Sequence, residues 1–163
     1  MKKKYGVLFV CTGNTCRSPM AEGILKAMLP MNFRDTISVN SAGTAGIPGS
    51  GATENAIMAA TECAADISEH ISRPVTEELL RESNLVLCMA SNHREFLDTR
   101  FPAFHDNYFL LKDFASPMKA HNPDIFDPIG GDLAKYRECC QIIATEIARI
   151  LPTVQQFAST TYL

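Results

Sequence analysis

The amino-acid sequence predicts an α/β protein with three layers, in which helices cover both faces of a central four-stranded parallel sheet in a Rossmann-like α/β/α arrangement. The prediction rests on short apolar segments that alternate with longer amphipathic ones, and on the turn residues between them. Strands that alternate with helices pair in parallel, because each helix returns the chain to the same end of the sheet. We expect one domain over residues 1–163, since no repeat, long linker or low-complexity stretch divides a chain that is 46% hydrophobic.

The predicted strands are runs of apolar, β-branched and aromatic residues. The first, at residues 5–11, reads Y-G-V-L-F-V-C, and the others are expected at 37–41, 85–89 and 108–111. Ligands of such sheets bind beyond the carboxyl ends of the strands. A site is therefore expected at Cys11, the last residue of the first strand.

The helices are predicted from start signals and apolar periodicity. Ser18, followed by Pro19, marks the start of a helix that extends to about residue 29. Further helices are expected at 54–63, at 76–82 with Thr76 as the cap, and at 92–100.

The last helix has the clearest pattern, because apolar residues recur every three or four positions from Leu133 to Ile150. Pro152 is expected to interrupt it, since proline has no main-chain N–H and its ring clashes with the preceding turn.

The loop at residues 11–17, C-T-G-N-T-C-R, is the main candidate site. A turn that ends at a helix N-terminus offers converging main-chain N–H groups and the positive end of the helix dipole to one anion of phosphate size. We expect this field and Arg17 to lower the pKa of the Cys11 thiol, and Arg17 to grip two oxygens of a phosphoryl group. The alternative is that Cys11 is a small buried apolar residue at a strand end.

The residue types within this loop favour the anion site. Gly13 allows close approach of the main chain, Asn14 tolerates an unusual backbone angle, and Ser18 can donate its hydroxyl to a thiolate. The expected phosphate-binding residues are Thr12, Gly13, Asn14, Thr15, Cys16 and Ser18.

The segment C-T-G-N-T-C-R-S-P resembles the signature of the low-molecular-weight protein tyrosine phosphatases. Three later motifs follow in the order and approximate spacing of that family: S-A-G at 41–43, L-V-L-C-M at 85–89 and D-P-I-G-G at 127–131. The likeness covers most of residues 5–152. It implies hydrolysis of phosphorylated protein side chains through a phosphocysteine on Cys11, with Ser41 in a supporting position.

Hydrolysis through a thiol also needs a proton donor for the leaving group. Asp127 lies in N-P-D-I-F-D-P-I-G-G, a proline- and glycine-rich segment typical of a surface loop, and the resemblance implies that its Asp-Pro pair holds the general acid. On spacing alone, a cap for the last helix is an equally good reading of Asp127. Asp124 is the neighbouring alternative, although no proline follows it.

The resemblance also bears on which side chain is cleaved. In the phosphotyrosine branch of the family an aliphatic residue stands where this chain has Thr15, and aromatic residues line the pocket. The corresponding stretches here read T-A-G-I-P-G at 44–49 and I-G-G at 129–131, without an aromatic residue. Thr15 with Thr12 resembles the bacterial protein-arginine-phosphatase branch, so phosphoarginine is favoured over phosphotyrosine. Phe126 is the one aromatic residue expected to be able to form a wall of the substrate pocket.

The other cysteines and the histidines suggest smaller roles. The resemblance implies a reversible disulfide between Cys11 and Cys16 that would protect the nucleophile from over-oxidation, and an ordinary loop residue is an equally good reading of Cys16. Cys88 and Cys140 are expected in the core. Neither the four histidines nor the cysteines have metal-ligand spacing, so no metal and no cofactor is expected.

Charge and composition exclude several classes of protein. A net charge of −3 without a basic stripe argues against nucleic-acid binding, and the apolar segments are too short to span a membrane. With six cysteines and no secretory segment, we expect a reduced, cytoplasmic protein. Its expected partners are phosphorylated proteins, with phosphate or another oxyanion in the active site, and neither nucleic acid nor membrane.

Two other functions stay open. Arsenate reductases share this fold and loop, but they need two further cysteines near the third strand, where Cys88 is followed by no second cysteine up to residue 101. A phosphoprotein-binding module without activity would lack catalytic groups, whereas this chain keeps Cys11, Arg17 and Asp127.

Overall fold

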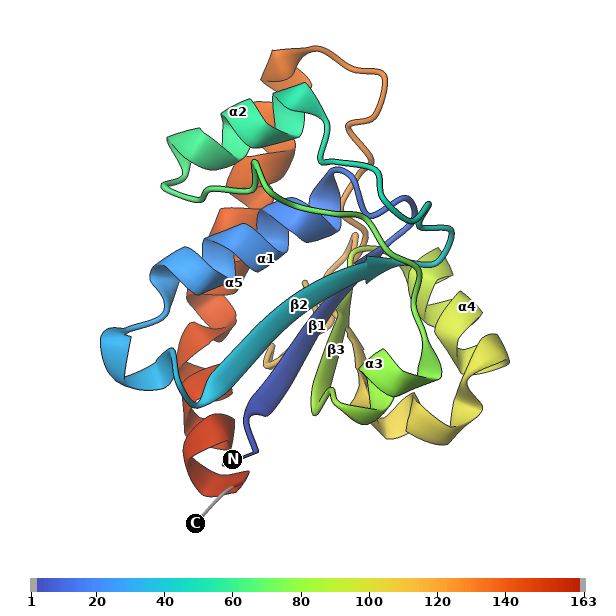
Figure 1. Cartoon of the computed structure of the whole chain (residues 1–163). Coiled ribbons are helices and arrows are strands. Elements are labelled where there is room, and N and C mark those ends of the chain that lie inside the picture. The colour runs from blue at the N-terminus through green and yellow to red at the C-terminus, as the bar shows by residue number, and fades with distance from the viewer. Residues whose placement is uncertain (1–2, 162–163) are drawn as a thin grey trace.

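The computed structural model describes residues 3–161, and within them it confirms the predicted four-stranded parallel sheet (Figure 1). The sheet has the order β2-β1-β3-β4, with each pairing parallel. Its strands are β1 (Tyr5–Cys11), β2 (Ile37–Gly43), β3 (Leu85–Cys88) and β4 (Tyr108–Leu110). Because β1 lies between β2 and β3, the segments that follow all three strands meet at one edge of the sheet.

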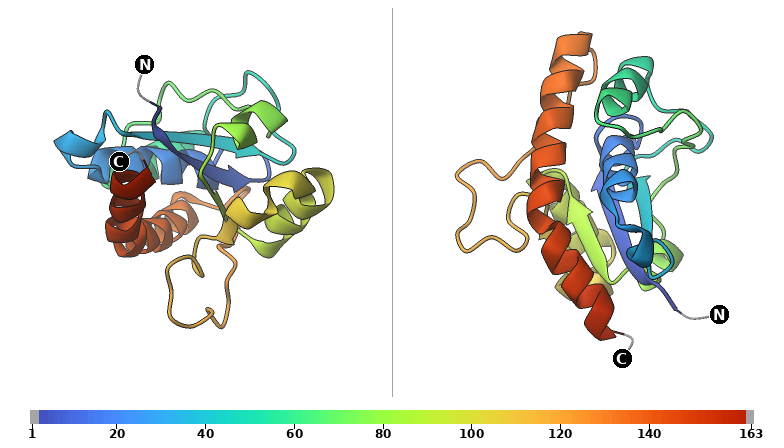
Figure 2. Two further views of the ribbon diagram at one scale, coloured as in Figure 1. Left: turned by 90° about the horizontal axis from the view of Figure 1, so that it is seen from below. Right: turned by 90° about the vertical axis from the view of Figure 1, so that its left-hand side faces the viewer.

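Helices cover both faces of the sheet, which confirms the three-layer α/β/α prediction (Figures 1 and 2). One face carries α1 (Arg17–Met28), α2 (Glu54–Glu62) and α5 (Leu133–Thr161). The other carries α3 (Glu77–Arg81) and α4 (Ser91–Arg100). Short 3₁₀ turns lie at η1 (Met31–Phe33) and η2 (Pro102–Asn107).

The alternation of side chains along β1 divides the core into two parts. Val7 and Phe9 pack in the larger part, beneath α1 and α5, while Leu8 and Val10 pack in the smaller part, beneath α3 and α4. Every residue of β1 is buried, as expected for a strand with helices on both sides.

The predicted element boundaries agree with the structure to within one or two residues, except at the end of the last helix. Thr76 caps α3 as predicted, and its hydroxyl accepts a hydrogen bond from the main chain of Leu79. The first helix begins at Arg17, one residue earlier than predicted.

The predicted interruption at Pro152 is wrong, because α5 continues through this residue to Thr161. The buried face of the helix continues with Val154 and Ala158, and Phe157 packs edge to face on Phe114 with ring centroids 6.3 Å apart. Tertiary packing beyond the proline therefore outweighs the local cost of a missing N–H donor.

The segment between β4 and α5 has no strand or helix, and part of it projects from the body of the molecule (Figure 2). Its later part returns to the sheet, where the N–H of Ile125 donates to the carbonyl of Met89 at 2.8 Å. This return brings Asp127 to the carboxyl edge of the sheet. No helix within residues 3–161 has the length and apolar character needed to cross a membrane.

We predict that Pro152→Ala raises the free energy of unfolding by about 2 kcal/mol, because it restores an N–H donor for the carbonyl of Ala148 in the preceding turn. The gain is reduced by the greater freedom of alanine in the unfolded chain. Chemical denaturation measures the change, with Gln156→Ala at another exposed position of α5 as the control. Equal stability of the two variants would contradict the prediction.

Candidate active site

The loop at residues 11–17 lies where the chain passes from the buried strand β1 into helix α1. Segments that follow β2 and precede α3 surround it. Its conformation is therefore set by contacts with parts of the chain that are distant in sequence.

The carbonyl groups of five successive loop residues are all held from outside the loop. Those of Cys11, Thr12 and Thr15 accept from the main-chain N–H groups of Thr44, Ala45 and Thr53, at 2.9, 2.9 and 3.0 Å. Those of Gly13 and Asn14 accept from the Ser72 hydroxyl at 2.9 Å and from His70 Nε2 at 2.8 Å.

These contacts also set the direction of the loop N–H groups. In a trans peptide the N–H points away from the preceding C=O. With the carbonyls turned outward, the N–H groups of residues 12–16 face the interior of the loop. This is the geometry that binds the oxygens of an anion.

Asn14 occupies the left-handed backbone region, with φ of 56°, as the sequence predicted. Its side-chain Oδ1 accepts from the main-chain N–H of Arg73 at 3.0 Å, which fixes the orientation of the amide. Nδ2 then donates to the hydroxyls of Ser18 and Ser41, at 2.8 and 3.0 Å. Each polar atom of this fully buried amide is thus satisfied.

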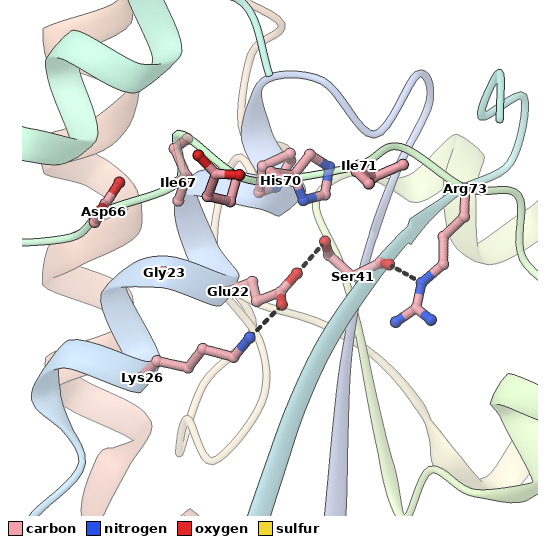
Figure 3. A pocket seen from close by; sticks show the side chains of 11 residues that line it. Glu22, Gly23, Lys26, Ser41, Asp66, Ile67, His70, Ile71 and Arg73 are labelled. Atoms are coloured by element: carbon pink, nitrogen blue, oxygen red, sulfur yellow. Dashed lines mark hydrogen bonds and ion pairs between the residues drawn. The ribbon is translucent and has the colours of Figure 1, made fainter. Parts of the chain in front are cut away.

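Ser41 supports Asn14 from behind the loop, at the wall of a pocket of about 440 Å³ (Figure 3). Its hydroxyl donates to the Glu22 carboxylate, which is also paired with Lys26. Arg73 Nε donates to the Ser41 carbonyl at 3.1 Å. Cys11 does not line this pocket, which lies against the back of the loop.

Gly43, the glycine of S-A-G, has to be a glycine because the loop packs against it. A Cβ at this position would lie 2.3 Å from the carbonyl oxygen of Thr12 and 3.0 Å from the nitrogen of Asn14. The absence of a side chain at this glycine therefore allows the loop to pack closely against the end of β2.

Cys11 is almost completely buried, with 2% of its surface exposed, and its sulfur lies 2.9 Å from the hydroxyl oxygen of Ser18. That oxygen accepts from Asn14, and its hydrogen has two acceptors within reach, Cys11 Sγ and, at 3.5 Å, the carbonyl of Ala42. A Cys11 thiolate can only accept, so in that state the Ser18 hydroxyl is its donor.

The expectation of a lowered pKa for Cys11 is wrong. Burial raises the pKa of the thiol above its ordinary value, because a thiolate in the interior loses its hydration. The hydroxyl and N–H of Ser18, the charge of Arg17 and the N–H of Asn14 each lower the pKa, but together they offset only part of the effect of burial. The prediction named these groups correctly and omitted desolvation.

Arg17 is buried, with 5% of its surface exposed, and its fork faces the mouth of the loop. Nη1 donates to the carbonyl of Ile125 at 3.0 Å. Nη2 lies 3.1 Å from Asp127 Oδ2 and 3.5 Å from Thr12 Oγ1. Three of the predicted site residues thus meet at Arg17 Nη2, where Thr12 and Asp127 approach Arg17.

Asp127 does not cap the last helix. Its Oδ1 accepts from the N–H of Ile129 at 3.1 Å, while Asp132 accepts from the N–H of Lys135 at the start of α5. The side chain of Asp127 is 41% exposed, so that it borders both Arg17 and solvent.

Asp124, the alternative acid, binds the N–H and the hydroxyl of Ser91 at the start of α4, each at 2.7 Å. These hydrogen bonds hold the pKa of Asp124 below its ordinary value. Its carboxylate therefore serves as a hydrogen-bond acceptor for the first residue of α4.

Thr15 and Cys16 lie on the side of the loop that faces α2 and α5. Cys16 Sγ is buried and lies 3.4 Å from the Tyr136 hydroxyl, 3.6 Å from the Thr53 hydroxyl and 3.7 Å from the Thr15 hydroxyl. Cys11 and Cys16 are both free thiols. Whether they join under oxidation stays a prediction.

Sequence reasoning missed four residues that hold the loop: His70, Ser72, Tyr136 and His93. His70 and Ser72 bind loop carbonyls, Tyr136 contacts Cys16, and His93 contacts the Thr12 hydroxyl at 2.8 Å. Because these residues are distant from the loop in sequence, no local sequence pattern indicated their contacts with it. Within residues 3–161, no three His, Cys, Asp or Glu side chains gather closely enough to hold a metal ion.

Comparison with known proteins finds relatives along nearly the whole chain. The family model for low molecular weight phosphotyrosine protein phosphatase matches residues 6–159. A protein-arginine-phosphatase from Geobacillus stearothermophilus is 38% identical over 152 residues, covering 93% of this chain and 97% of the relative. One from Bacillus subtilis (strain 168) is 37% identical over 132 residues, covering 81% and 85%.

A solved structure shares the fold. It is a variant of the YwlE arginine phosphatase with a phosphorylated active-site serine, and it superposes with a TM-score of 0.81 at 31% identity, over 95% of this chain and 97% of that one.

We predict that Ser18→Ala shifts the pH profile of Cys11 alkylation to higher pH, because the thiolate loses a hydrogen-bond donor. A hydrogen bond to a charged group contributes about 1.5–3 kcal/mol, so the midpoint should rise by about one to two pH units. Iodoacetamide labelling with mass spectrometry of the Cys11 peptide measures the profile. Ser68→Ala, at an exposed position where the hydroxyl donates to Asp66, is the control. An unchanged midpoint in Ser18→Ala would show that the hydroxyl does not stabilise the thiolate.

Proposed function

Because the chain belongs to the low molecular weight phosphotyrosine protein phosphatase family and is a hydrolase of that family, we propose that it dephosphorylates protein side chains through a phosphocysteine on Cys11. The observation that carries this proposal is the arrangement of loop 11–17. Five carbonyls turned outward leave the N–H groups facing inward around a buried sulfur, with the Arg17 fork at the mouth.

In the first step the Cys11 thiol passes its proton to an oxygen of the dianionic phosphoryl group, the resulting thiolate attacks phosphorus, an S–P bond forms, and the bond to the leaving oxygen or nitrogen breaks. The loop N–H groups and Arg17 bind the phosphoryl oxygens as their charge shifts in the transition state. Asp127 gives its proton to the leaving atom. A phosphoryl group bound to both terminal nitrogens of Arg17 competes with Asp127 for Nη2, which leaves the carboxyl group free to face the leaving group.

In the second step water attacks the phosphocysteine, the S–P bond breaks, and phosphate leaves. The Asp127 carboxylate takes the proton from water, which returns it to its acid form. Ser18 donates to the departing sulfur and stabilises the thiolate as it takes up negative charge. The phosphorylated active-site serine of the YwlE variant supports a covalent intermediate in this chain.

The residues around the mouth favour phosphoarginine as the substrate side chain. Ile47 and Ile129, in the two stretches predicted to lack aromatic residues, are 69% and 61% exposed. Phe126 packs against the core and lies beneath Lys135, whose Nζ is 5.7 Å from the ring centroid. A phenyl ring therefore has few partners for stacking, whereas a guanidinium needs polar neighbours such as Thr15. The names of the arginine phosphatase relatives support the same choice.

The structure disfavours the arsenate reductase alternative. Cys88, its candidate redox cysteine, is completely buried, and burial raises the pKa of its thiol to about 12. A thiol in this environment is a poor nucleophile for redox relay. The alternative of an inactive binding module has no specific observation in its favour.

We predict that Cys11→Ser abolishes turnover of phosphoarginine and phosphotyrosine peptides and keeps the binding of inorganic phosphate. A serine hydroxyl is a far weaker nucleophile than a thiolate at neutral pH, while the N–H groups and Arg17 are unchanged. Release of phosphate measures turnover, and a competition assay measures binding. Cys88→Ser serves as the matched control. Turnover by Cys11→Ser at the wild-type rate would exclude the phosphocysteine.

We predict that Asp127→Asn slows hydrolysis of substrates with poor leaving groups by about 100- to 10,000-fold, the range typical of general acid catalysis. Activated aryl phosphates, which need little protonation, should lose less. Asp124→Asn is the matched control for a nearby carboxylate, and its loss should be independent of the leaving group. If Asp127→Asn slows both substrate types equally, the carboxylate has a structural role only.

We predict that wild-type protein has a higher kcat/KM for phosphoarginine than for phosphotyrosine peptides, and that Thr15→Ile shifts the ratio toward phosphotyrosine. The substitution replaces a polar contact for the guanidinium by an apolar surface. Thr15→Ser keeps the hydroxyl and should keep the ratio. A wild-type preference for phosphotyrosine that Thr15→Ile leaves unchanged would refute the arginine assignment.

A further inference from the structure

His93 is a completely buried histidine that the mechanism above does not use. It lies in the first turn of α4 and contacts the loop across the carboxyl edge of the sheet. Its Nε2 is 2.8 Å from Thr12 Oγ1, a contact between residues 81 positions apart in sequence.

The surroundings of His93 fix which ring nitrogen carries the hydrogen. The main-chain N–H of Ala90 lies 3.1 Å from Nδ1 and can only donate, so Nδ1 is the acceptor. In the neutral ring the hydrogen is then on Nε2, and Nε2 donates to Thr12 Oγ1. Burial, together with the charge of Arg17, lowers the pKa of His93 to about 4, so the ring stays neutral at physiological pH.

This donation decides what the Thr12 hydroxyl can do. Its oxygen accepts from His93, and Arg17 Nη2 approaches the same oxygen at 3.5 Å. With the acceptor positions taken, the hydroxyl hydrogen points in a third direction. The exposed Thr12 side chain lies at the mouth of the loop, where Arg17 Nη2 also meets Asp127.

We propose that His93 is a positioning residue that holds the Thr12 hydroxyl as a hydrogen-bond donor to the phosphoryl oxygen bound by Arg17 Nη2. The inference rests on the proposed function, because it assigns a task to the side chain of Thr12 within that reaction. A guanidinium has only donors and cannot accept from Thr12. In a phosphoarginine side chain, the phosphoryl oxygens are therefore the acceptors for the Thr12 hydroxyl.

The catalytic effect is that of a preorganised donor. As negative charge develops on the phosphoryl oxygens, a hydroxyl that is already oriented stabilises it without reorganisation. Without His93 the hydroxyl can rotate and donate elsewhere, so the loss should fall more on kcat than on KM.

Two variants separate the two hydrogen bonds of His93. In His93→Asn the amide oxygen replaces Nδ1 and keeps the contact with the Ala90 N–H, but the donor to Thr12 is lost. In His93→Gln the amide nitrogen replaces Nε2–H and keeps the donor to Thr12, while the contact with Ala90 is lost. If His93 positions Thr12, His93→Gln should be more active than His93→Asn. If His93 only supports the main chain at Ala90, His93→Asn should be the more active variant.

The assay uses para-nitrophenyl phosphate, which tests the phosphoryl site independently of the protein side chain cleaved. We expect His93→Asn to lower kcat/KM by about 10- to 100-fold, somewhat less than the loss of a complete oxyanion donor. In His93→Gln most of this activity should be retained.

Thr12→Val should lower kcat/KM as much as His93→Asn does. The variant that carries both Thr12→Val and His93→Asn should be no slower than Thr12→Val alone, because both changes remove the same interaction. His121→Asn, at an exposed position, is the control.

The inhibition constant of vanadate is a second measurement. It is a binding constant, so its interpretation does not depend on which step of the reaction limits the rate. The inhibition constant should rise in His93→Asn and Thr12→Val, and stay near the wild-type value in His93→Gln. The inference is overturned if His93→Asn retains wild-type kinetics, if His93→Gln is the more damaged variant, or if the effects of Thr12→Val and His93→Asn multiply. Absence of turnover in the wild-type protein would instead refute the proposed function.

Discussion

The left-handed backbone of Asn14 is the constraint on which the active-site loop depends. A left-handed conformation costs a non-glycine residue about 1–2 kcal/mol. Four hydrogen bonds offset this cost: three from the side chain, with Arg73, Ser18 and Ser41, and one from the carbonyl, with His70. The reversal of the chain at Asn14 lets the neighbouring carbonyls point outward, so that the N–H groups meet inside.

Two main-chain N–H groups fix the orientation of two polar side chains that support the site. The N–H of Arg73 fixes the Asn14 amide, so that Nδ2 donates to the Ser18 hydroxyl, whose own hydrogen faces the sulfur of Cys11 and the carbonyl of Ala42. The N–H of Ala90 fixes the ring of His93 in the same manner. Because a main-chain N–H can only donate, the Asn14 amide has one orientation and the neutral His93 ring one tautomer. The fold thereby determines an amide orientation and a ring tautomer that the residue types alone leave open.

The elements and the loop could be predicted from sequence because their signals are local. Strand composition, helix periodicity and the residue types of loop 11–17 are readable within short windows. The contact of His93 with Thr12 could not be predicted, because it joins residues from two elements across the sheet. The continuation of α5 past Pro152 depends on tertiary packing at Val154, and the raised pKa of Cys11 depends on burial. Both effects arise only once the chain has folded.

The burial of Cys11 has two opposing effects on catalysis. It disfavours the thiolate by removing water, yet it also strengthens each interaction between the loop donors and any charge placed inside. In the proposed reaction the sulfur loses negative charge as it attacks phosphorus, while the phosphoryl oxygens remain anionic and are bound by the same N–H groups. Donors that are oriented by folding need no rearrangement when the charge moves from sulfur to oxygen. A buried, donor-lined loop therefore stabilises the transition state more than it stabilises a thiolate without substrate, which is the condition for catalysis by differential binding.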